Sequence, residues 1–242
     1  MIVLQVENLV KKYGKFTAIN DISFELTEGK IIGLIGPNGA GKTTTLKCIT
    51  GLLKSNAGRV LIMDKCIRDK EARSNIAYIP ETPDIYGMLT VWEHLKFIAL
   101  AYNLKNWEVH AEELLQKFDL KDKRNDLCKN LSKGMTQKVS ICSNLLHDPQ
   151  VILVDEPMIG LDPKAIRELK DAFKTLKEEG KTVFISTHLL DNAQNLCDEV
   201  IVMKKGKIIA KGSLEELRKD FNAGKDVTLE DLFLEVTEDE KN

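Results

Sequence analysis

Hydrophobic residues occur in short runs along the chain, and their spacing predicts alternating strands and helices. Residues 22–26 alternate between apolar and polar side chains, which predicts a strand with one face exposed to water. Four other runs are almost wholly apolar and predict buried strands: 31–35, 75–79, 151–154 and 182–186. Further strands are expected at 2–8, 58–63, 200–203 and 208–210, with a basic turn at 11–14. The pattern therefore favours the α/β class of folds.

The segment 82–146 interrupts this alternation, because its residues are mostly helical in character. Thr90 opens a capping box, which predicts the start of one helix. Asn106 is placed to cap a second helix, whose buried face we expect to include Val109. Ser132 is placed to cap a third helix. These signals predict a helical subdomain inserted into the α/β fold.

The composition excludes several classes of protein. The chain has 242 residues with 35 basic and 37 acidic side chains, a net charge of −2, so nucleic acid is not expected as a direct partner. Five cysteines without a Cys-x-x-Cys pair indicate reduced thiols rather than a disulfide framework or a zinc site. No apolar run reaches the roughly 18 residues that a membrane span needs, and the first residues lack the features of a leader peptide. If the protein serves a membrane, we expect it to act through a partner.

The apolar run 31–35 leads directly into a phosphate-binding motif, Gly-Pro-Asn-Gly-Ala-Gly-Lys-Thr-Thr, which matches the P-loop pattern G-x-x-x-x-G-K-[ST]. Its glycines let backbone N–H groups surround anionic oxygens, and the helix that follows adds the positive end of its dipole. Lys42 would place a mobile charge at the β- and γ-phosphates, and Thr43 would place a hydroxyl on Mg²⁺. The residues of this motif that we expect to bind the nucleotide are Gly36, Pro37, Asn38, Gly39, Ala40, Gly41, Lys42, Thr43 and Thr44.

Two acidic residues follow the apolar run 151–154. The carboxyl ends of the strands in an open α/β sheet form the ligand crevice, so Asp155 and Glu156 should lie beside the P-loop. Asp155 is positioned to hold Mg²⁺ together with Thr43. Glu156 faces a different direction and can orient or deprotonate the attacking water. The P-loop and the two acids together predict a magnesium-dependent nucleotide site.

With these and further motifs, the chain resembles the ATP-binding subunit of ABC transporters over essentially its whole length. The further motifs occur in the family's order: Tyr13 at the adenine-stacking position, Tyr78-Ile79-Pro80-Glu81 at the Q-loop, Leu131-Ser132-Lys133-Gly134-Met135 at the signature, Gly160-Leu161-Asp162 at the D-loop, and His188 after Ser186-Thr187. The resemblance implies one P-loop NTPase domain, 1–242, with a mixed sheet. Its parts would be a RecA-like core with an N-terminal antiparallel β subdomain (1–81 and 147–212), a helical signature subdomain (82–146) and a C-terminal helical extension (213–242).

The resemblance also implies roles for individual residues, with ATP and Mg²⁺ as the bound groups. Tyr13 would stack on adenine, while Glu156 and His188 would be catalytic. Ser132 and Gly134 would bind the γ-phosphate held by a second ATPase subunit, so that two chains enclose two ATP molecules. We expect this second subunit to be an identical chain. A further expected partner is an integral membrane permease, which would hold the protein on the inner, cytoplasmic face of the cell membrane.

Two departures from the family pattern bear on the mechanism. Lys133 and Met135 replace the glycine and glutamine common in the signature, but they leave the phosphate-binding positions intact. Glu81 replaces the usual glutamine and adds negative charge near the acids; as a hard oxygen ligand it is also a candidate to bind Mg²⁺ or a water. Both departures resemble the branch of the family that drives drug, antibiotic-peptide or sodium efflux.

The sequence therefore favours an ATPase subunit that dimerises on ATP and drives a separate membrane permease, most of all an exporter. One alternative is a non-transport ABC ATPase that acts on a ribosome, nucleic acid or a protein-assembly scaffold. Such relatives usually carry two ATP domains or a long coiled-coil insert, and this sequence shows neither. A P-loop kinase for a small molecule is a third possibility, but it gives no role to residues 131–135.

Overall fold

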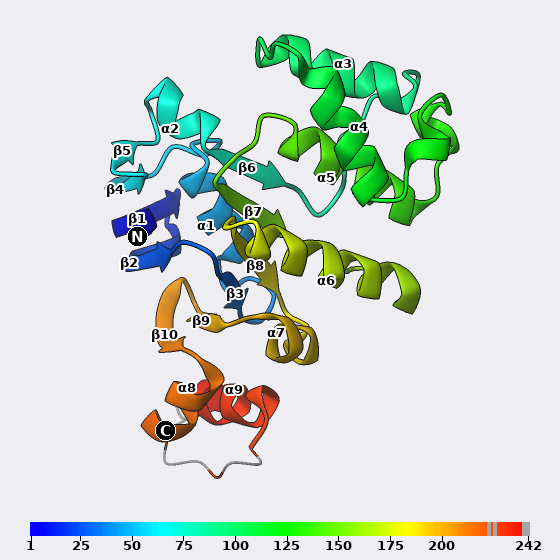
Figure 1. Ribbon diagram of the computed structural model, residues 1–242. Helices are drawn as coiled ribbons and strands as arrows, with labels where there is room; N and C mark the ends of the chain where they lie inside the picture. Colours follow the sequence, from blue (N-terminus) through cyan, green and yellow to red (C-terminus); the bar gives the residue numbers. More distant parts are fainter. Residues whose placement is uncertain (222–223, 225–226, 239–242) are drawn as a thin grey trace.

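The computed structural model describes residues 1–221, 224 and 227–238. Parts of the predicted C-terminal extension, at 222–223, 225–226 and 239–242, lie outside the described residues. The described strands form two sheets (Figure 1). One is antiparallel, in the order β2 (Phe16–Thr27), β1 (Ile2–Tyr13), β4 (Ala57–Ile62) and β5 (Lys65–Cys66).

The second sheet lies at the centre of the molecule and carries the buried apolar runs. Its strand order is β10 (Lys207–Gly212), β9 (Glu199–Lys204), β3 (Ile31–Ile35), β8 (Thr182–Thr187), β7 (Val151–Asp155) and β6 (Ile76–Ile79). Neighbouring strands from β9 to β6 run parallel, and β10 pairs with β9 in the antiparallel direction. The predicted mixed sheet is confirmed.

The hairpin of β1 and β2 differs from the sequence prediction. The expected turn at 11–14 is wrong, because Lys11, Lys12 and Tyr13 all belong to β1 and pair with β2. The chain instead reverses over Gly14 and Lys15, where Gly14 has φ +57°. A glycine followed by one other residue suits a tight hairpin turn, and the two strands therefore stay paired to their ends.

The helical segment is built from α3 (Val91–Ala101), α4 (Trp107–Lys117) and α5 (Lys133–Leu145), which lie together at the top of Figure 1. The capping box at Thr90 is confirmed, and so is the cap at Ser132, whose hydroxyl accepts a hydrogen bond from the Met135 N–H. Asn106 stands at the N-cap of α4, but the prediction that its side chain caps the helix is wrong: its backbone is left-handed and no capping hydrogen bond forms. The prediction that Val109 lies on the buried face of α4 is wrong, because its side chain is 68% exposed. A helix turns by about 100° per residue, and the buried residues Ala111, Leu114 and Leu115 lie on the opposite side of α4 from Val109.

The remaining helices cover the central sheet and form the C-terminal part: α1 (Lys42–Ile49), α2 (Lys70–Ser74), α6 (Pro163–Glu178), α7 (Leu190–Leu196), α8 (Leu214–Asp220) and α9 (Leu229–Glu238). Short 3₁₀ turns occur at Lys121–Lys123 and Cys128–Asn130. One hydrophobic cluster joins α1 and the antiparallel sheet to one side of the central sheet. A second joins α6 and the helical segment to the other side. The central sheet is thus held between two packed layers.

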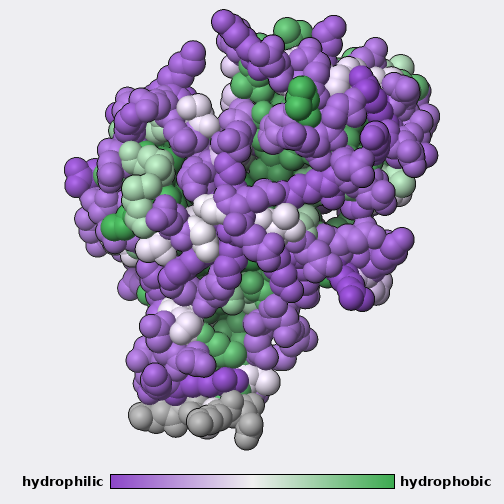
Figure 2. All heavy atoms as spheres, in the orientation of Figure 1, coloured by the Kyte–Doolittle hydropathy of each residue, from purple (hydrophilic) through white to green (hydrophobic). Residues whose placement is uncertain are grey.

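Hydrophilic residues cover most of the face seen in Figure 2, and hydrophobic residues reach the surface there in small patches. Among the described residues, no helix is both long and apolar enough to cross a membrane.

Candidate nucleotide-binding site

The loop between β3 and α1 forms a close-fitting phosphate cradle. Gly41 has φ +108°, in the left-handed region that favours glycine. A Cβ atom on Gly41 would lie 2.6 Å from the Ala18 carbonyl oxygen, and one on Gly36 would lie 2.3 Å from that of Met203. Any other residue at either position would push neighbouring backbone away. The glycines therefore let the loop fold tightly in front of α1, whose N-terminus is the positive end of a helix dipole.

The Lys42 side chain lies along this cradle and is only 6% exposed. Its ammonium group donates hydrogen bonds to the carbonyl oxygens of Gly36, at 2.8 Å, and Pro37, at 3.4 Å. The same Nζ atom lies 3.3 Å from Oε1 of Glu156. The lysine charge is thus held between the phosphate-binding loop and the end of β7.

Asp155, at the end of β7, is the second fixed point of the site. Its Oδ1 atom accepts hydrogen bonds from the hydroxyls of Thr43, at 3.0 Å, and Ser186, at 2.6 Å. Its Oδ2 atom accepts one from the Tyr78 hydroxyl at 3.1 Å. Burial raises the pKa of Tyr78, and the negative charge of Asp155 raises it further, so the phenol keeps its proton and remains a donor. The carboxylate is therefore oriented by three hydroxyls.

Glu156 turns away from Asp155, as expected, because its backbone is left-handed with φ +46°. Its N–H donates to the Ser186 hydroxyl at 3.1 Å, which ties it to β8. Its Oε2 atom lies 3.1 Å from Nδ1 of His188 and accepts a hydrogen bond from the His188 N–H at 3.3 Å. With Lys42 at its other oxygen, the carboxylate has a nitrogen partner on each side.

These groups open into one cavity of about 450 Å³, a size that suits a small ligand. Most of the predicted site residues line it: Tyr13, Asn38, Gly39, Ala40, Gly41, Lys42, Thr43, Thr44, Glu81, Glu156 and His188. Gly36 and Pro37 support the cavity through their bonds to Lys42, and Asp155 through its bond to Thr43.

Among the described residues of the predicted site, Ser132 and Gly134 are the two that neither line this cavity nor support it through a bond to a lining residue. They stand at the start of α5, where a Cβ atom on Gly134 would lie 3.5 Å from the Cβ of Ala165 in α6. The Ser132 side chain is exposed. Within one chain, the signature residues and the P-loop are therefore separate.

The structure adds residues that the sequence did not single out. Phe16 and Ala18 on β2 line the cavity, as does Ile159 after β7. Tyr78 and Ser186 lie in quoted motifs, but their hydroxyl bonds to Asp155 depend on how β6, β7 and β8 pair. The one available sequence signal was at the hairpin: Phe16 and Tyr13 flank a two-residue turn and so stand opposite each other.

The oxygen atoms of Thr43 and Asp155 fit a magnesium ion, because Mg²⁺ prefers hard oxygen ligands. In the described part of the chain, no group of three or more His, Cys, Asp or Glu side chains is placed to hold a metal. A magnesium ion here would therefore take its other ligands from phosphate oxygens and water, as it commonly does in nucleotide sites. Glu81 lies on the cavity wall.

The fold and the site together define a P-loop nucleoside triphosphatase. Comparison with known proteins narrows this class, since residues 19–159 match the family model described as ABC transporter. The chain is 39% identical over 244 residues to the ABC-type transporter ATP-binding protein EcsA of Bacillus subtilis (strain 168), and the match covers 99% of this chain and 98% of that protein. It is also 34% identical over 219 residues to the linearmycin resistance ATP-binding protein LnrL of the same strain, covering 89% and 70%.

A solved structure described as the ATP binding subunit of an ABC transporter matches with a TM-score of 0.90 and 36% identity, covering 98% of this chain and 100% of that one. The chain therefore belongs to the family of ABC transporter ATP-binding proteins, which bind ATP and couple its hydrolysis to transport. The predicted family, fold class and ATPase activity are confirmed.

Proposed function

We propose that this chain dimerises on ATP and Mg²⁺, hydrolyses the ATP, and drives a separate integral membrane permease, most of all an exporter. The observation that carries the proposal is the separation of Ser132 and Gly134 from the cavity that holds the P-loop. A hydroxyl and a backbone N–H at a helix N-terminus can bind an anion, and in this chain they lie outside the cavity of the chain's own P-loop. A second copy would bring these groups to the γ-phosphate and complete the site.

In the proposed reaction, a water attacks the γ-phosphorus while the bond to the β–γ bridging oxygen breaks, which yields ADP and phosphate. Glu156 would orient this water and take its proton, since its carboxylate borders the cavity. His188, held at 3.1 Å from Glu156, would donate a hydrogen bond to the γ-phosphate, and Lys42 would attract the β- and γ-phosphates. Tyr13 would stack on adenine. Bound Mg²⁺, held by Thr43 and Asp155 with Glu81 nearby, would neutralise charge on the phosphate oxygens.

The exporter direction is supported by two features. Glu81, Lys133 and Met135 are the departures that resemble the efflux branch of the family. A relative that covers 89% of this chain is named a linearmycin resistance protein. The proposed transport role calls for a membrane permease as partner, which would hold this subunit at the inner face of the membrane.

The central experiment tests the composite site. A chain with Lys42→Ala is mixed with a chain carrying Ser132→Arg, and the ATPase rate is measured. Because each mixed dimer would contain one site with both defects and one with neither, activity should rise well above that of either variant alone. No gain on mixing would overturn the proposed dimer.

A second measurement tests the role of Glu156. Glu156→Gln keeps the side chain's shape but removes its ability to take a proton, so the ATPase rate should fall by about 100-fold or more while ATP-dependent dimers accumulate in size-exclusion chromatography. Glu178→Gln, the same change at an exposed position on α6, is the matched control. Near-normal hydrolysis by Glu156→Gln would contradict the assignment. Purification of the native complex from membranes then tests the transport role, since a multi-helix integral protein should accompany the chain.

A further inference from the structure

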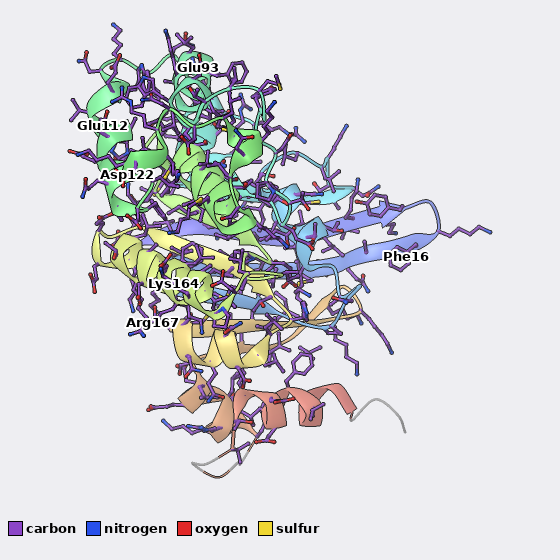
Figure 3. The ribbon with its side chains drawn as sticks, turned by 90° about the vertical axis from the view of Figure 1, so that its right-hand side faces the viewer. Phe16, Glu93, Glu112, Asp122, Lys164 and Arg167 are labelled. Atoms are coloured by element: carbon purple, nitrogen blue, oxygen red, sulfur yellow. The ribbon has the colours of Figure 1, made fainter. Side chains whose placement is uncertain are left out.

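Phe16 is a large apolar side chain in an unusual place. It is 63% exposed at the start of β2, directly after the two-residue turn of the hairpin. Figure 3 shows it near the far end of the β1–β2 hairpin. The ring has no aromatic partner among the described residues. Packing within the chain therefore does not explain a phenylalanine at this position.

The register of the hairpin places Phe16 beside the residue expected to stack on adenine. Tyr13 and Phe16 are direct partners in the antiparallel pair, so their side chains lie on the same face of the hairpin. Ala18 lies on that face too, two residues along β2, and its carbonyl oxygen touches the position where a Cβ of Gly41 would stand. All of these residues line the cavity of the P-loop. This face of the hairpin thus carries two aromatic rings beside the turn, and it meets the phosphate cradle at Ala18, two residues further along β2.

Tyr13 does not offer both faces of its ring to a ligand. The Lys11 ammonium lies over the ring, 5.0 Å from its centre, so one face is taken by a cation. Tyr13 itself is 48% exposed. A base in the mouth of the cavity would therefore meet one face of Tyr13 and the uncovered ring of Phe16.

We propose that Phe16 is a second base-contacting residue, which together with Tyr13 makes the site prefer the wide ring system of a purine. This inference rests on the proposed ATP-driven function of the same site. An aromatic ring at this position gains contact area with any base, and a purine offers more than a pyrimidine. The phosphates would not take part in this contact, because the loop expected to bind them meets β2 at Ala18 and not at Phe16.

The test uses isothermal titration calorimetry with ADP, CDP and tripolyphosphate. None of these ligands is ATP, so binding is measured without ATP hydrolysis. Loss of one aromatic–base stack corresponds to a fall in affinity of about fivefold to 150-fold, so Phe16→Ala should weaken ADP binding by at least about fivefold. Its preference for ADP over CDP should also fall, while its affinity for tripolyphosphate stays within about twofold of wild type. Phe16→Tyr keeps a flat ring and should restore ADP binding. Phe97→Ala removes an aromatic ring that is 43% exposed on α3, away from the cavity, and should change nothing.

Three results would overturn the inference, and they can be told apart. Wild-type affinity of Phe16→Ala for ADP, with a loss in Tyr13→Ala, would leave the nucleotide site intact and remove Phe16 from it. An equal loss for ADP and tripolyphosphate would mean that the substitution disturbs the phosphate cradle instead. Failure of the wild-type protein to bind ADP would overturn the nucleotide site itself, and the role of Phe16 with it.

Discussion

Ser186 offers the sharpest test of how the acidic end of the site is held, because its buried hydroxyl serves both acids. It donates to Oδ1 of Asp155 at 2.6 Å and accepts from the N–H of Glu156 at 3.1 Å. Ser186→Ala removes the hydroxyl from a site where the residue is 0% exposed and water cannot replace it. Asp155 keeps its bonds to Thr43 and Tyr78, so the fold should survive the change.

The size of the effect follows from the partner's charge. A hydrogen bond to a charged group contributes about 1.5–3 kcal/mol to the free energy of unfolding, whereas a neutral one contributes about 0.5–1.5 kcal/mol. Ser143 is the matched control, because it is also buried but its hydroxyl donates only to the neutral carbonyl of Val139, at 2.8 Å in the same helix. Alanine also favours a helix, which further reduces the cost of Ser143→Ala. Ser186→Ala should therefore destabilise the protein by about 1–2 kcal/mol more than Ser143→Ala does.

Urea unfolding followed by circular dichroism measures this difference, with equal slopes showing that the unfolded states are comparable. The ATPase rate should also fall for Ser186→Ala, by about 10- to 100-fold, because groups that orient a metal-binding carboxylate typically have effects of this size. Equal stability of the two variants, together with an ATPase rate within about twofold of wild type for Ser186→Ala, would refute the reasoning.

Two further predictions follow from the same contacts. Tyr78→Phe removes one hydroxyl from Asp155 but keeps the ring, so a titration of ATPase rate with Mg²⁺ should show a several-fold higher requirement for the ion; an unchanged curve would contradict this. Hydrogen bonds from the backbone and side chain of Thr90 lower the pKa of Glu93 from its usual 4.5. The charged form of Glu93 in the capping box therefore stabilises the folded state above pH 4.5, and this stabilisation is lost as the pH falls through the lowered pKa. The difference in Tm between wild type and Glu93→Gln should thus shrink between pH 7 and pH 3.5, and a constant difference would contradict the account.

Local patterns in the sequence predicted most strands, the caps at Thr90 and Ser132 and the glycine-rich loop before α1, but the cap predicted at Asn106 is wrong. The P-loop is a contiguous motif, and Asp155 follows an apolar run that can only be a buried strand in this context. Errors arose where the local signal was ambiguous. Val109 fits a loosely drawn apolar face but lies on the wrong side of α4, and the basic residues at 11–12 suggested a turn although they extend β1.

The remaining site residues could not be predicted because their roles depend on distant pairing. Tyr78 reaches Asp155 across 77 positions of sequence, and Ser186 reaches it across 31. Both contacts require that β6, β7 and β8 be neighbours in a particular register. Phe16 likewise pairs with Tyr13 only when the hairpin turn is placed at Gly14 and Lys15.

The three hydroxyls that meet at Asp155 have a consequence for anyone who recombines this chain with a homologue. Thr43 and Tyr78 belong to the N-terminal half of the domain, while Asp155 and Ser186 belong to the C-terminal half. A chimera with its crossover in the helical segment between β6 and β7 would join donors from one parent to a carboxylate from the other. Since a hydrogen bond tolerates shifts of only a few tenths of an ångström, such hybrids should fold more readily than they catalyse. Crossovers before β3 or after β8 keep all four residues from one parent.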